Sequence, residues 1–170
     1  MPSTAERFKD EILRHHIAFS SVGPTTLRKM VGKGKRKRIC NCLTEIDLSV
    51  LQHRKLAAVI DGWTQELRQK VHIKWGPARK AINLYLRDIS YNFMARRKYR
   101  AEKFEKQLEI PLDNKIMSKI RSKTGSRRLR RSSVKGLTCC LSNDYQQEAQ
   151  KIADKKKMLR VDLDALWWSR

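Results

Sequence analysis

The sequence predicts an all-α protein that folds as a single helical domain over residues 1–170. Apolar residues recur at three- and four-residue intervals through most of the chain, which is the spacing of amphipathic helices, whereas the alternation typical of strands is scarce. A chain of 170 residues is long enough for one domain with a substantial core, or one domain and a tail. No run approaches the roughly 20 apolar residues that cross a bilayer, so no membrane partner is expected.

The N-terminal part of the chain predicts a helix followed by a charged loop. The helix is expected over residues 4–19, with one apolar face, and a Gly-Pro pair ends it. Residues 28–38 then hold seven Lys and Arg residues, two glycines and no acid, which predicts a basic flexible loop. This run is either a solvated charge cluster or a DNA contact, for which Arg36 and Arg38 are the candidates.

Two helices joined by a hairpin are expected at the centre of the domain. The first covers residues 49–70 and is weakened at Gly62 by roughly 1 kcal/mol relative to alanine. The turn-like tripeptide Trp75-Gly76-Pro77 precedes the second, over residues 78–93, which is the densest apolar stretch in the chain. This pair predicts a helix-hairpin-helix element whose second helix lies at the middle of the core.

The second half of the chain predicts shorter elements. A basic helix is expected over residues 96–107, and Pro111 interrupts the pattern after it. Asp113 is expected to cap a helix over residues 114–121, with its carboxylate near the positive end of the helix dipole. A basic loop or insertion, a core-packing helix and a short apolar terminal element follow, at residues 121–133, 142–157 and 161–168.

The charge of the chain predicts a polyanionic partner. Lys and Arg number 39 against 17 Asp and Glu, which gives a net charge of +22 and an isoelectric point near 10.4. Like charges on one fold repel each other unless counter-charge is supplied, so DNA is the expected partner. Besides the loop over 28–38, a second strip between Lys115 and Arg131 holds eight basic residues and no acid, and Lys115 and Lys119 are its candidate phosphate contacts.

Metal, cofactor and export signals are weak or missing. The cysteines occur as Cys40-x-Cys42 and Cys139-Cys140, and neither pair has the spacing of a zinc site, so neither a metal nor another cofactor is expected. The N-terminus has no apolar segment typical of secretory signals. The sequence therefore predicts a cytoplasmic, nucleoid-associated protein, and we expect a monomer.

Three segments, taken in order, resemble one family of DNA repair enzymes. They are WGPARKAINLYL at residues 75–86, IPLD at 110–113 and LDALWW at 163–168. Together they resemble the archaeal 8-oxoguanine DNA glycosylases, a branch of the helix-hairpin-helix DNA glycosylase superfamily, over about residues 74–168. The resemblance implies a DNA glycosylase and AP lyase that excises a damaged base, in particular an oxidised purine, from duplex DNA through a lysine Schiff base.

The resemblance also implies the residues of a catalytic site. A lysine inside the second helix of the hairpin is the family's nucleophile, and an aspartate after a proline-containing segment assists it; Lys80 and Asp113 occupy these positions. Near the C-terminus the family binds the extruded base with an aspartate and a tryptophan one helical turn apart, which Asp164 and Trp168 match.

Other positions depart from the family or contact DNA outside the pocket. Leu84 stands where the family has an aromatic residue that stacks on the base, which puts the identity of the substrate in doubt. Arg87 occupies the position of a basic residue near the base. Gly76 and Arg79 belong to the hairpin region, which would hold phosphates through backbone N–H groups and positive charge.

The chemistry of a Schiff-base enzyme explains these residue types. The amine must be neutral to attack the sugar C1′ atom, so its pKa must be lowered by burial or by neighbouring cations, and Arg79 is the expected cation. Asp113 would stabilise the positive charge that develops on the sugar, or would move protons. The base must leave the stack to be reached, and stacking together with a carboxylate hydrogen bond offsets part of that cost.

Two other classes of protein fit the same sequence. The first is a non-catalytic basic helical protein that coats or bends DNA or RNA, because residues 1–70 contain no motif of the family. The second is a phage or mobile-element accessory protein that acts through protein contacts. Under either alternative Asp113 is only a helix cap and Trp168 is a core or interface anchor.

Overall fold

All regular structure is helical in the residues that the computed structural model describes, which are 3–23, 27, 31–32, 34–52 and 55–168. The expected all-α fold class is therefore confirmed. No helix within these ranges is long and apolar enough to cross a membrane. The α-helices are α1 Thr4–Ser21, α3 Lys35–Thr44, α4 Leu56–Val71, α5 Trp75–Tyr91, α6 Phe93–Lys98, α7 Asn114–Thr124, α8 Cys139–Lys155 and α9 Asp162–Trp168. Short 3-10 helices are η1 Leu48–Gln52, η2 Ala101–Lys103, η3 Glu105–Gln107 and η4 Val134–Gly136.

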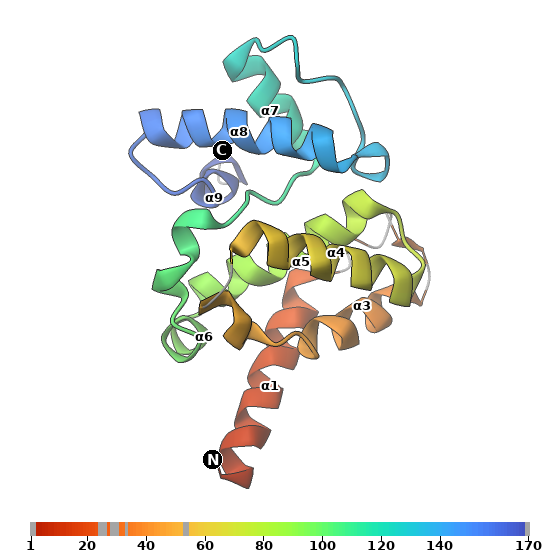
Figure 1. The fold of residues 1–170 in the computed structure, drawn as a ribbon, viewed down its shortest axis with the longest axis vertical. Helices are drawn as coiled ribbons and strands as arrows, with labels where there is room; N and C mark the ends of the chain where they lie inside the picture. Colours follow the sequence, from red (N-terminus) through yellow and green to blue (C-terminus); the bar gives the residue numbers. More distant parts are fainter. Residues whose placement is uncertain (1–2, 24–26, 28–30, 33, 53–54, 169–170) are drawn as a thin grey trace.

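Two clusters of buried apolar side chains divide the molecule into two lobes (Figure 1). The N-terminal lobe contains α1 and α3 to α6, and its cluster runs in sequence from Ile17 to Leu108. The C-terminal lobe contains α7 to α9 around a cluster that runs from Ile110 to Trp167. Val161 packs with the first cluster although it lies just before α9, so the end of the chain ties the two lobes together.

Helix α5 lies at the centre, as the apolar density predicts. Every residue from Gly76 to Leu86 is buried, so this stretch has no solvent-facing side. A helix that is buried all round must find partners for its polar side chains inside the protein, because an unpaired buried polar group costs about 1 to 3 kcal/mol. Arg79, Lys80 and Asn83 have such partners, and these partners define the candidate site. The buried hydroxyl group of Tyr85 has no hydrogen-bond partner among the described residues.

The hairpin lies earlier in the chain than the sequence pattern indicates. Helices α4 and α5 pack against each other across the three-residue connection 72–74, with His72 in the left-handed conformation at φ 54°. The tripeptide Trp75-Gly76-Pro77 is the first turn of α5 rather than the turn itself. Proline fits there because the first helical turn has no intrahelical partner for its missing N–H group.

Two predicted segments differ from the structure in the N-terminal lobe. Residues 35–38 of the predicted basic loop are the first turn of α3, which begins after Gly34 in a left-handed conformation at φ 80°, while 28–30 and 33 lie outside the described residues. The predicted helix over 49–70 is interrupted before Leu56, and not at Gly62. Its first part is η1, which is 3-10 because Leu48 and Leu51 both turn into the core.

Two further predicted segments differ from the structure, one in the N-terminal lobe and one in the C-terminal lobe. The predicted helix over 96–107 is three short pieces, α6, η2 and η3, and Arg100 lies between α6 and η2 in the left-handed conformation at φ 51°. Of the predicted basic loop over 121–133, the first four residues extend α7 as far as Thr124, and the rest is non-helical as expected. That loop is not a loose insertion, because Leu129 is buried in the C-terminal core.

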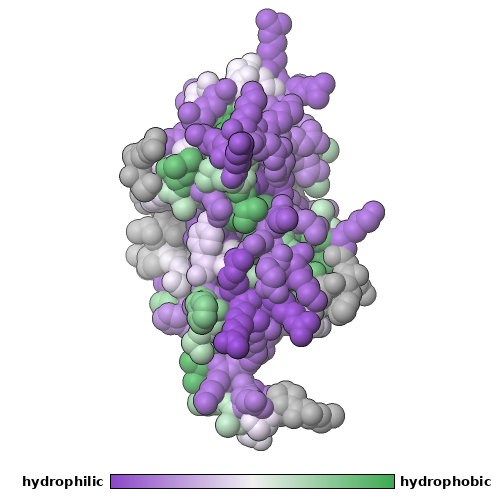
Figure 2. Space-filling model, turned by 90° about the vertical axis from the view of Figure 1, so that its left-hand side faces the viewer, coloured by the Kyte–Doolittle hydropathy of each residue, from purple (hydrophilic) through white to green (hydrophobic). Residues whose placement is uncertain are grey.

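Helix α1 has an apolar face that remains largely exposed. Phe8 and Ile12 stay open to solvent because the first turns of the helix extend beyond the core (Figure 1). Phe19 lies in the last turns beside buried Ile17 and Ala18, and its exposed ring contacts the guanidinium of Arg36 at 4.3 Å. Elsewhere hydrophilic side chains cover most of the face in Figure 2, with apolar side chains in small patches. This distribution agrees with the high net charge of the chain.

Candidate active site

The structure brings Lys80 and Asp113 together at the junction of the two lobes. Lys80 is on α5 and is only 5% exposed, and its Nζ atom lies 3.5 Å from Oδ2 of Asp113. Asp113 caps α7, where its Oδ1 atom accepts a hydrogen bond of 2.8 Å from the N–H group of Ile116. The predicted cap is therefore confirmed, and the same carboxylate faces the lysine with its second oxygen.

Burial makes the Lys80 amine a weaker base than an ordinary lysine. The pKa of Lys80 is lowered from its usual 10.5, and the largest cause is loss of contact with water, which disfavours the charged form. Asp113 and Asp164 oppose this shift, whereas Arg87 adds to it. The cation that lowers the pKa is thus Arg87 and not Arg79, which corrects the expectation from the sequence.

Arg87 and Asp164 form an ion pair that acts electrostatically on the Lys80 amine. Arg87 lies two helical turns after Lys80 on α5, and its guanidinium bonds to Asp164 of α9 and to Asp88. The Asp164 side chain is almost fully buried, which raises the pKa of its carboxyl group, although Arg87 opposes that shift. The two predicted base-binding residues, Arg87 and Asp164, are therefore partners of each other and lie close enough to Lys80 to affect its charge.

The two tryptophans of α9 point in different directions. Trp167 is 3% exposed and belongs to the C-terminal core, whereas Trp168 is 63% exposed. The Nζ atom of Lys115, in the first turn of α7, lies 5.3 Å from the centroid of the Trp168 ring. Lys119 donates a hydrogen bond of 3.0 Å to the carbonyl oxygen of Trp167. Trp168 is therefore free of the core and lies beside the helix that Asp113 begins.

Leu84 is one turn after Lys80 and is buried at 4% exposure, so α5 offers an aliphatic surface at the position where the resemblance implies an aromatic ring. Isoleucine, leucine and aromatic side chains all exclude water, but only a ring stacks on a base with its face. The Trp168 indole is exposed beside Lys115, and its role as a stacking surface stays a prediction.

A Trp168→Ala change is expected to reduce excision of a purine lesion at least tenfold while lowering the free energy of unfolding by less than about 1 kcal/mol, because base stacking contributes roughly 1 to 3 kcal/mol and the side chain is exposed. The matched control is Trp167→Ala, a core truncation that should cost about 3 to 5 kcal/mol. Urea unfolding and excision rate per folded molecule separate the two effects. A Trp168→Ala protein that unfolds easily but retains full activity would show that the indole has only a packing role.

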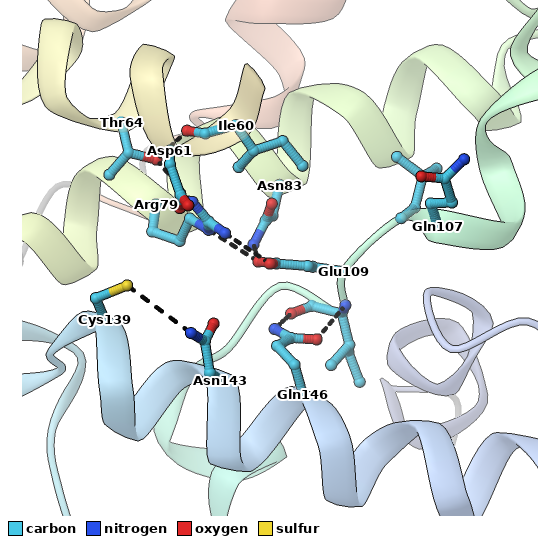
Figure 3. A network of polar contacts seen from close by, with 12 residues as sticks. Ile60, Asp61, Thr64, Arg79, Asn83, Gln107, Glu109, Cys139, Asn143 and Gln146 are labelled. Atoms are coloured by element: carbon cyan, nitrogen blue, oxygen red, sulfur yellow. Dashed lines mark hydrogen bonds and ion pairs between the residues drawn. The ribbon is translucent and has the colours of Figure 1, made fainter. Parts of the chain in front are cut away.

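A buried polar network holds the segment that carries Asp113 (Figure 3). Arg79 of α5 donates to both oxygens of Glu109, with distances of 2.9 Å from Nε and 2.6 Å from Nη2, in the two-pronged geometry that suits a guanidinium and a carboxylate. Asn83 donates to the same carboxylate at 2.8 Å. These bonds fix the backbone four residues before Asp113.

The next residue along the segment is fixed from the other lobe (Figure 3). The side-chain amide of Gln146 on α8 accepts from the N–H group of Ile110 at 3.1 Å and donates to its carbonyl oxygen at 2.8 Å. Gln146 therefore replaces the backbone partner that a strand would supply to this extended segment. Because Glu109 is bound to α5 and Ile110 to α8, the distance between Lys80 and Asp113 depends on both lobes.

This network changes the roles of two predicted DNA contacts. Arg79 is 3% exposed and forms ion pairs with Glu109 and Asp61. Its guanidinium therefore lies in the protein interior, where a DNA phosphate cannot contact it. Gly76 packs against η4, where an added Cβ atom would lie 1.9 Å from the carbonyl oxygen of Val134. A glycine is required there by the close approach of two backbones, and this correction removes both residues from the candidate DNA surface.

The other predicted DNA contacts remain at the surface or at its edge. Arg36 donates to the carbonyl oxygen of Val22 at 2.6 Å and Arg38 to that of Lys70 at 2.8 Å, so both guanidiniums also satisfy carbonyl groups just after or at the ends of helices α1 and α4. Lys115 is exposed beside Trp168. Their contacts with DNA stay a prediction.

Removing one partner of the Arg79–Glu109 pair is expected to destabilise the fold strongly. A Glu109→Leu change leaves a buried guanidinium with only the half-exposed Asp61 as an acidic partner, which should cost about 3 to 5 kcal/mol of unfolding free energy. The double variant Arg79→Met with Glu109→Leu should recover much of that loss, because it removes both charges and fills the space. Urea unfolding of the two single variants and the double variant measures the coupling, and losses that simply add would contradict a coupled pair.

Sequence reasoning missed Glu109 and Gln146. Glu109 stands inside the otherwise apolar run Leu108 to Leu112, and an acid in such a run indicates a buried partner, so a signal was available. Gln146 carries no comparable signal, because its role is defined by the backbone of a segment 36 residues away.

No group of three or more His, Cys, Asp or Glu side chains that could hold a metal ion occurs in the described ranges. Comparison with known proteins gives no further assignment: no family model, no curated protein and no solved structure matches this chain. The site is therefore interpreted from its own geometry and from the resemblance of its three segments.

Proposed function

We propose that this protein is a DNA glycosylase with AP lyase activity, which excises a damaged base, in particular an oxidised purine, through a Schiff base at Lys80. The observation that carries the proposal is the position of the Lys80 amine, which is buried, has a lowered pKa and lies 3.5 Å from the Asp113 carboxylate at the junction of two lobes. A buried lysine of lowered pKa beside a carboxylate is the pairing that an amine nucleophile requires. The order of the three segments along the chain supports the same assignment.

The proposed reaction assigns a separate task to each group. The neutral Lys80 amine attacks C1′ of the damaged nucleotide, and the bond from C1′ to the base breaks as the base leaves with that electron pair and takes up a proton. Asp113, as a carboxylate, stabilises positive charge on the sugar during this step and accepts a proton from the amine. The sugar ring then opens to give the Schiff base, loss of a C2′ proton expels the 3′ phosphate, and water finally releases Lys80.

The proposed base approaches the site from the side of its partly exposed residues. The amine itself is nearly covered, but the side chains of Asp113 and Arg87 are partly exposed and Trp168 is open to solvent. An extruded base would enter between these groups, with the indole available for stacking and the Arg87–Asp164 pair available for hydrogen bonds to the base edge. Extrusion costs a few kcal/mol, and these contacts offset part of it.

An excision assay tests the proposal. Duplex oligonucleotides that each contain one lesion, beginning with 8-oxoguanine, should lose the base, and the strand should be cut without added alkali. A glycosylase without lyase activity would need alkali for the cut. A non-catalytic DNA- or RNA-binding protein, the alternative that the charge supports, would bind the same duplexes and leave every one intact.

An Arg87→Gln change is expected to move the pH dependence of excision. Arg87 lowers the pKa of Lys80, whereas Asp164 raises it, so loss of Arg87 removes one lowering influence and also frees Asp164 to raise that pKa. A higher pKa leaves more of the amine protonated at neutral pH, so the rising limb of the rate profile should shift to higher pH. The control Arg96→Gln, far from the amine and paired with Glu105, should leave the limb in place. A shift to lower pH would contradict the assigned role.

A further inference from the structure

A basic cavity opens beside α7, close to the candidate active site. It has a volume of about 420 Å³ and includes Asn114, the residue that follows Asp113. One wall is α7 and the other is the segment that leads into η4. The polar side chains that line it come from Ser118, Arg121, Arg131, Ser132, Ser133 and Tyr145.

The α7 wall follows from the helical repeat. Asn114, Ser118 and Arg121 are spaced at four and three residues, so they share one face of α7 and form a continuous polar row that begins next to Asp113. Lys115, the residue after Asn114, lies instead beside the ring of Trp168. Helix α7 therefore presents two different basic faces on either side of its capping aspartate.

The opposite wall is fixed by the core of the C-terminal lobe. Leu129 and Val134 are buried on either side of Arg131, and the hydroxyl group of Tyr145 donates to the carbonyl oxygen of Arg130 at 2.9 Å. The side chain of Ser133 accepts from the N–H group of Gly136 and caps η4. The basic segment thus has a defined path, although its composition alone resembles an unstructured insertion.

The cavity has positive charge without compensating acid. No acidic residue lies between Asp113 and Asp144 in the sequence, and none lines the cavity. Within the described part of the chain, neither Arg121 nor Arg131 forms an ion pair with a carboxylate. Two guanidiniums that converge on one hydroxyl-lined cavity favour an anionic ligand with several acceptor oxygens.

We propose that this cavity binds a backbone phosphate of the DNA strand, a few nucleotides from the one that reacts at Lys80. Arg121 and Arg131 donate to its non-bridging oxygens, and the hydroxyl groups of Ser132 and Ser133 complete the site. This inference rests on the proposed function above, because it needs DNA as the ligand.

Size and position agree with that ligand. A cavity of 420 Å³ has the volume of about a dozen water molecules, which is enough for a phosphate group and part of its sugars. At about 1.5 Å per residue, Arg121 lies roughly 12 Å along α7 from Asp113. That distance corresponds to roughly three or four base steps of DNA at about 3.4 Å each. A phosphate held there would set the register of the strand relative to Lys80.

Binding of undamaged labelled duplex across a salt series tests the proposal. The double change Arg121→Gln with Arg131→Gln should weaken binding roughly 10- to 100-fold at low salt, because hydrogen bonds between charged groups are lost, and should reduce the salt slope by about one. The matched control is Lys123→Gln with Lys156→Gln, which removes equal charge from another part of the C-terminal lobe and should weaken binding only a few-fold. Equal losses of affinity in the arginine and the lysine double variants would mean that DNA responds only to overall charge, and would overturn the proposal.

A charge-preserving pair provides the second arm. Arg121→Lys with Arg131→Lys keeps the net charge but removes the planar, two-pronged donors, so it should lose at least several-fold in affinity. Binding equal to that of the unchanged protein would overturn a built phosphate site. Because this duplex carries no lesion, its binding does not depend on catalysis. If the excision assay left every lesion-containing duplex intact, the proposed glycosylase activity would be wrong. The affinities of the arginine variants for undamaged duplex would still show whether the cavity binds a phosphate.

Discussion

Replacing Lys80 with glutamine is expected to abolish base excision and covalent capture of DNA, while binding of undamaged duplex stays within a few-fold. The Lys80 amine is buried beside Asp113 and has a lowered pKa, and it is the nucleophile of the proposed mechanism. One charge among 39 basic residues contributes little to phosphate affinity. Excision rates on a lesion-containing duplex and dissociation constants on an undamaged one measure the two quantities separately.

The control for this change is Lys123→Gln, which removes the same charge from the last turn of α7 and should excise at the normal rate. Glutamine at position 80 should not unfold the protein, because Asp113 remains partly exposed and keeps its hydrogen bond to the N–H group of Ile116. Undiminished excision by the Lys80→Gln protein would mean that another group is the nucleophile, and the assignment would fail.

Replacing Asp113 with asparagine is expected to slow excision by about a hundredfold or more without disturbing the fold. The two oxygens of Asp113 have separate roles, because Oδ1 accepts the hydrogen bond that caps α7 and Oδ2 faces the Lys80 amine. Asparagine caps helices about as well as aspartate, so the cap survives. In the proposed mechanism the change removes the negative charge that stabilises the reacting sugar, and such electrostatic contributions are worth about 10² to 10³ in rate.

The pH profile of the same variant distinguishes the possible causes of the loss. Asp113 raises the pKa of Lys80, so its removal should lower that pKa and leave more neutral amine at a given pH. The slower reaction would therefore occur despite a more available nucleophile. Asp113→Ala, which also loses the cap, should in addition lower the unfolding free energy by about 1 kcal/mol. Normal turnover of Asp113→Asn would leave Asp113 as a helix cap alone.

The helices that sequence reasoning located best are those whose apolar period is strong. Helix α5 was predictable because its apolar residues cover all sides of the helix, and α7 because Asp113 is a capping residue before a periodic run. The three short pieces over 96–107 were not predictable from the sequence, because the basic residues of this segment favour a helix locally. The chain nevertheless bends at Arg100, on its way to the other lobe. Such a bend is decided by tertiary packing.

The candidate site was predictable to the extent that it depends on residue type and order. Lys80, Asp113 and Asp164 are close together as the resemblance implies, although they belong to three different helices or helix ends. The internal role of Arg79 was not predictable, because a basic residue inside a basic chain gives no signal of burial. The positions of Glu109 and Asp61 in the structure show that its charge is used within the protein.

Borohydride capture followed by peptide mapping tests the central claim most directly. The unchanged protein is incubated with a duplex containing 8-oxoguanine or an abasic site, sodium borohydride is added, and the covalent complex is digested and sequenced by mass spectrometry. A Schiff-base mechanism predicts one DNA-modified residue, Lys80, with no complex in the Lys80→Gln protein and an unchanged yield in Lys123→Gln. The absence of a covalent complex on either duplex, or modification spread over exposed lysines such as Lys115 and Lys123, would contradict the account.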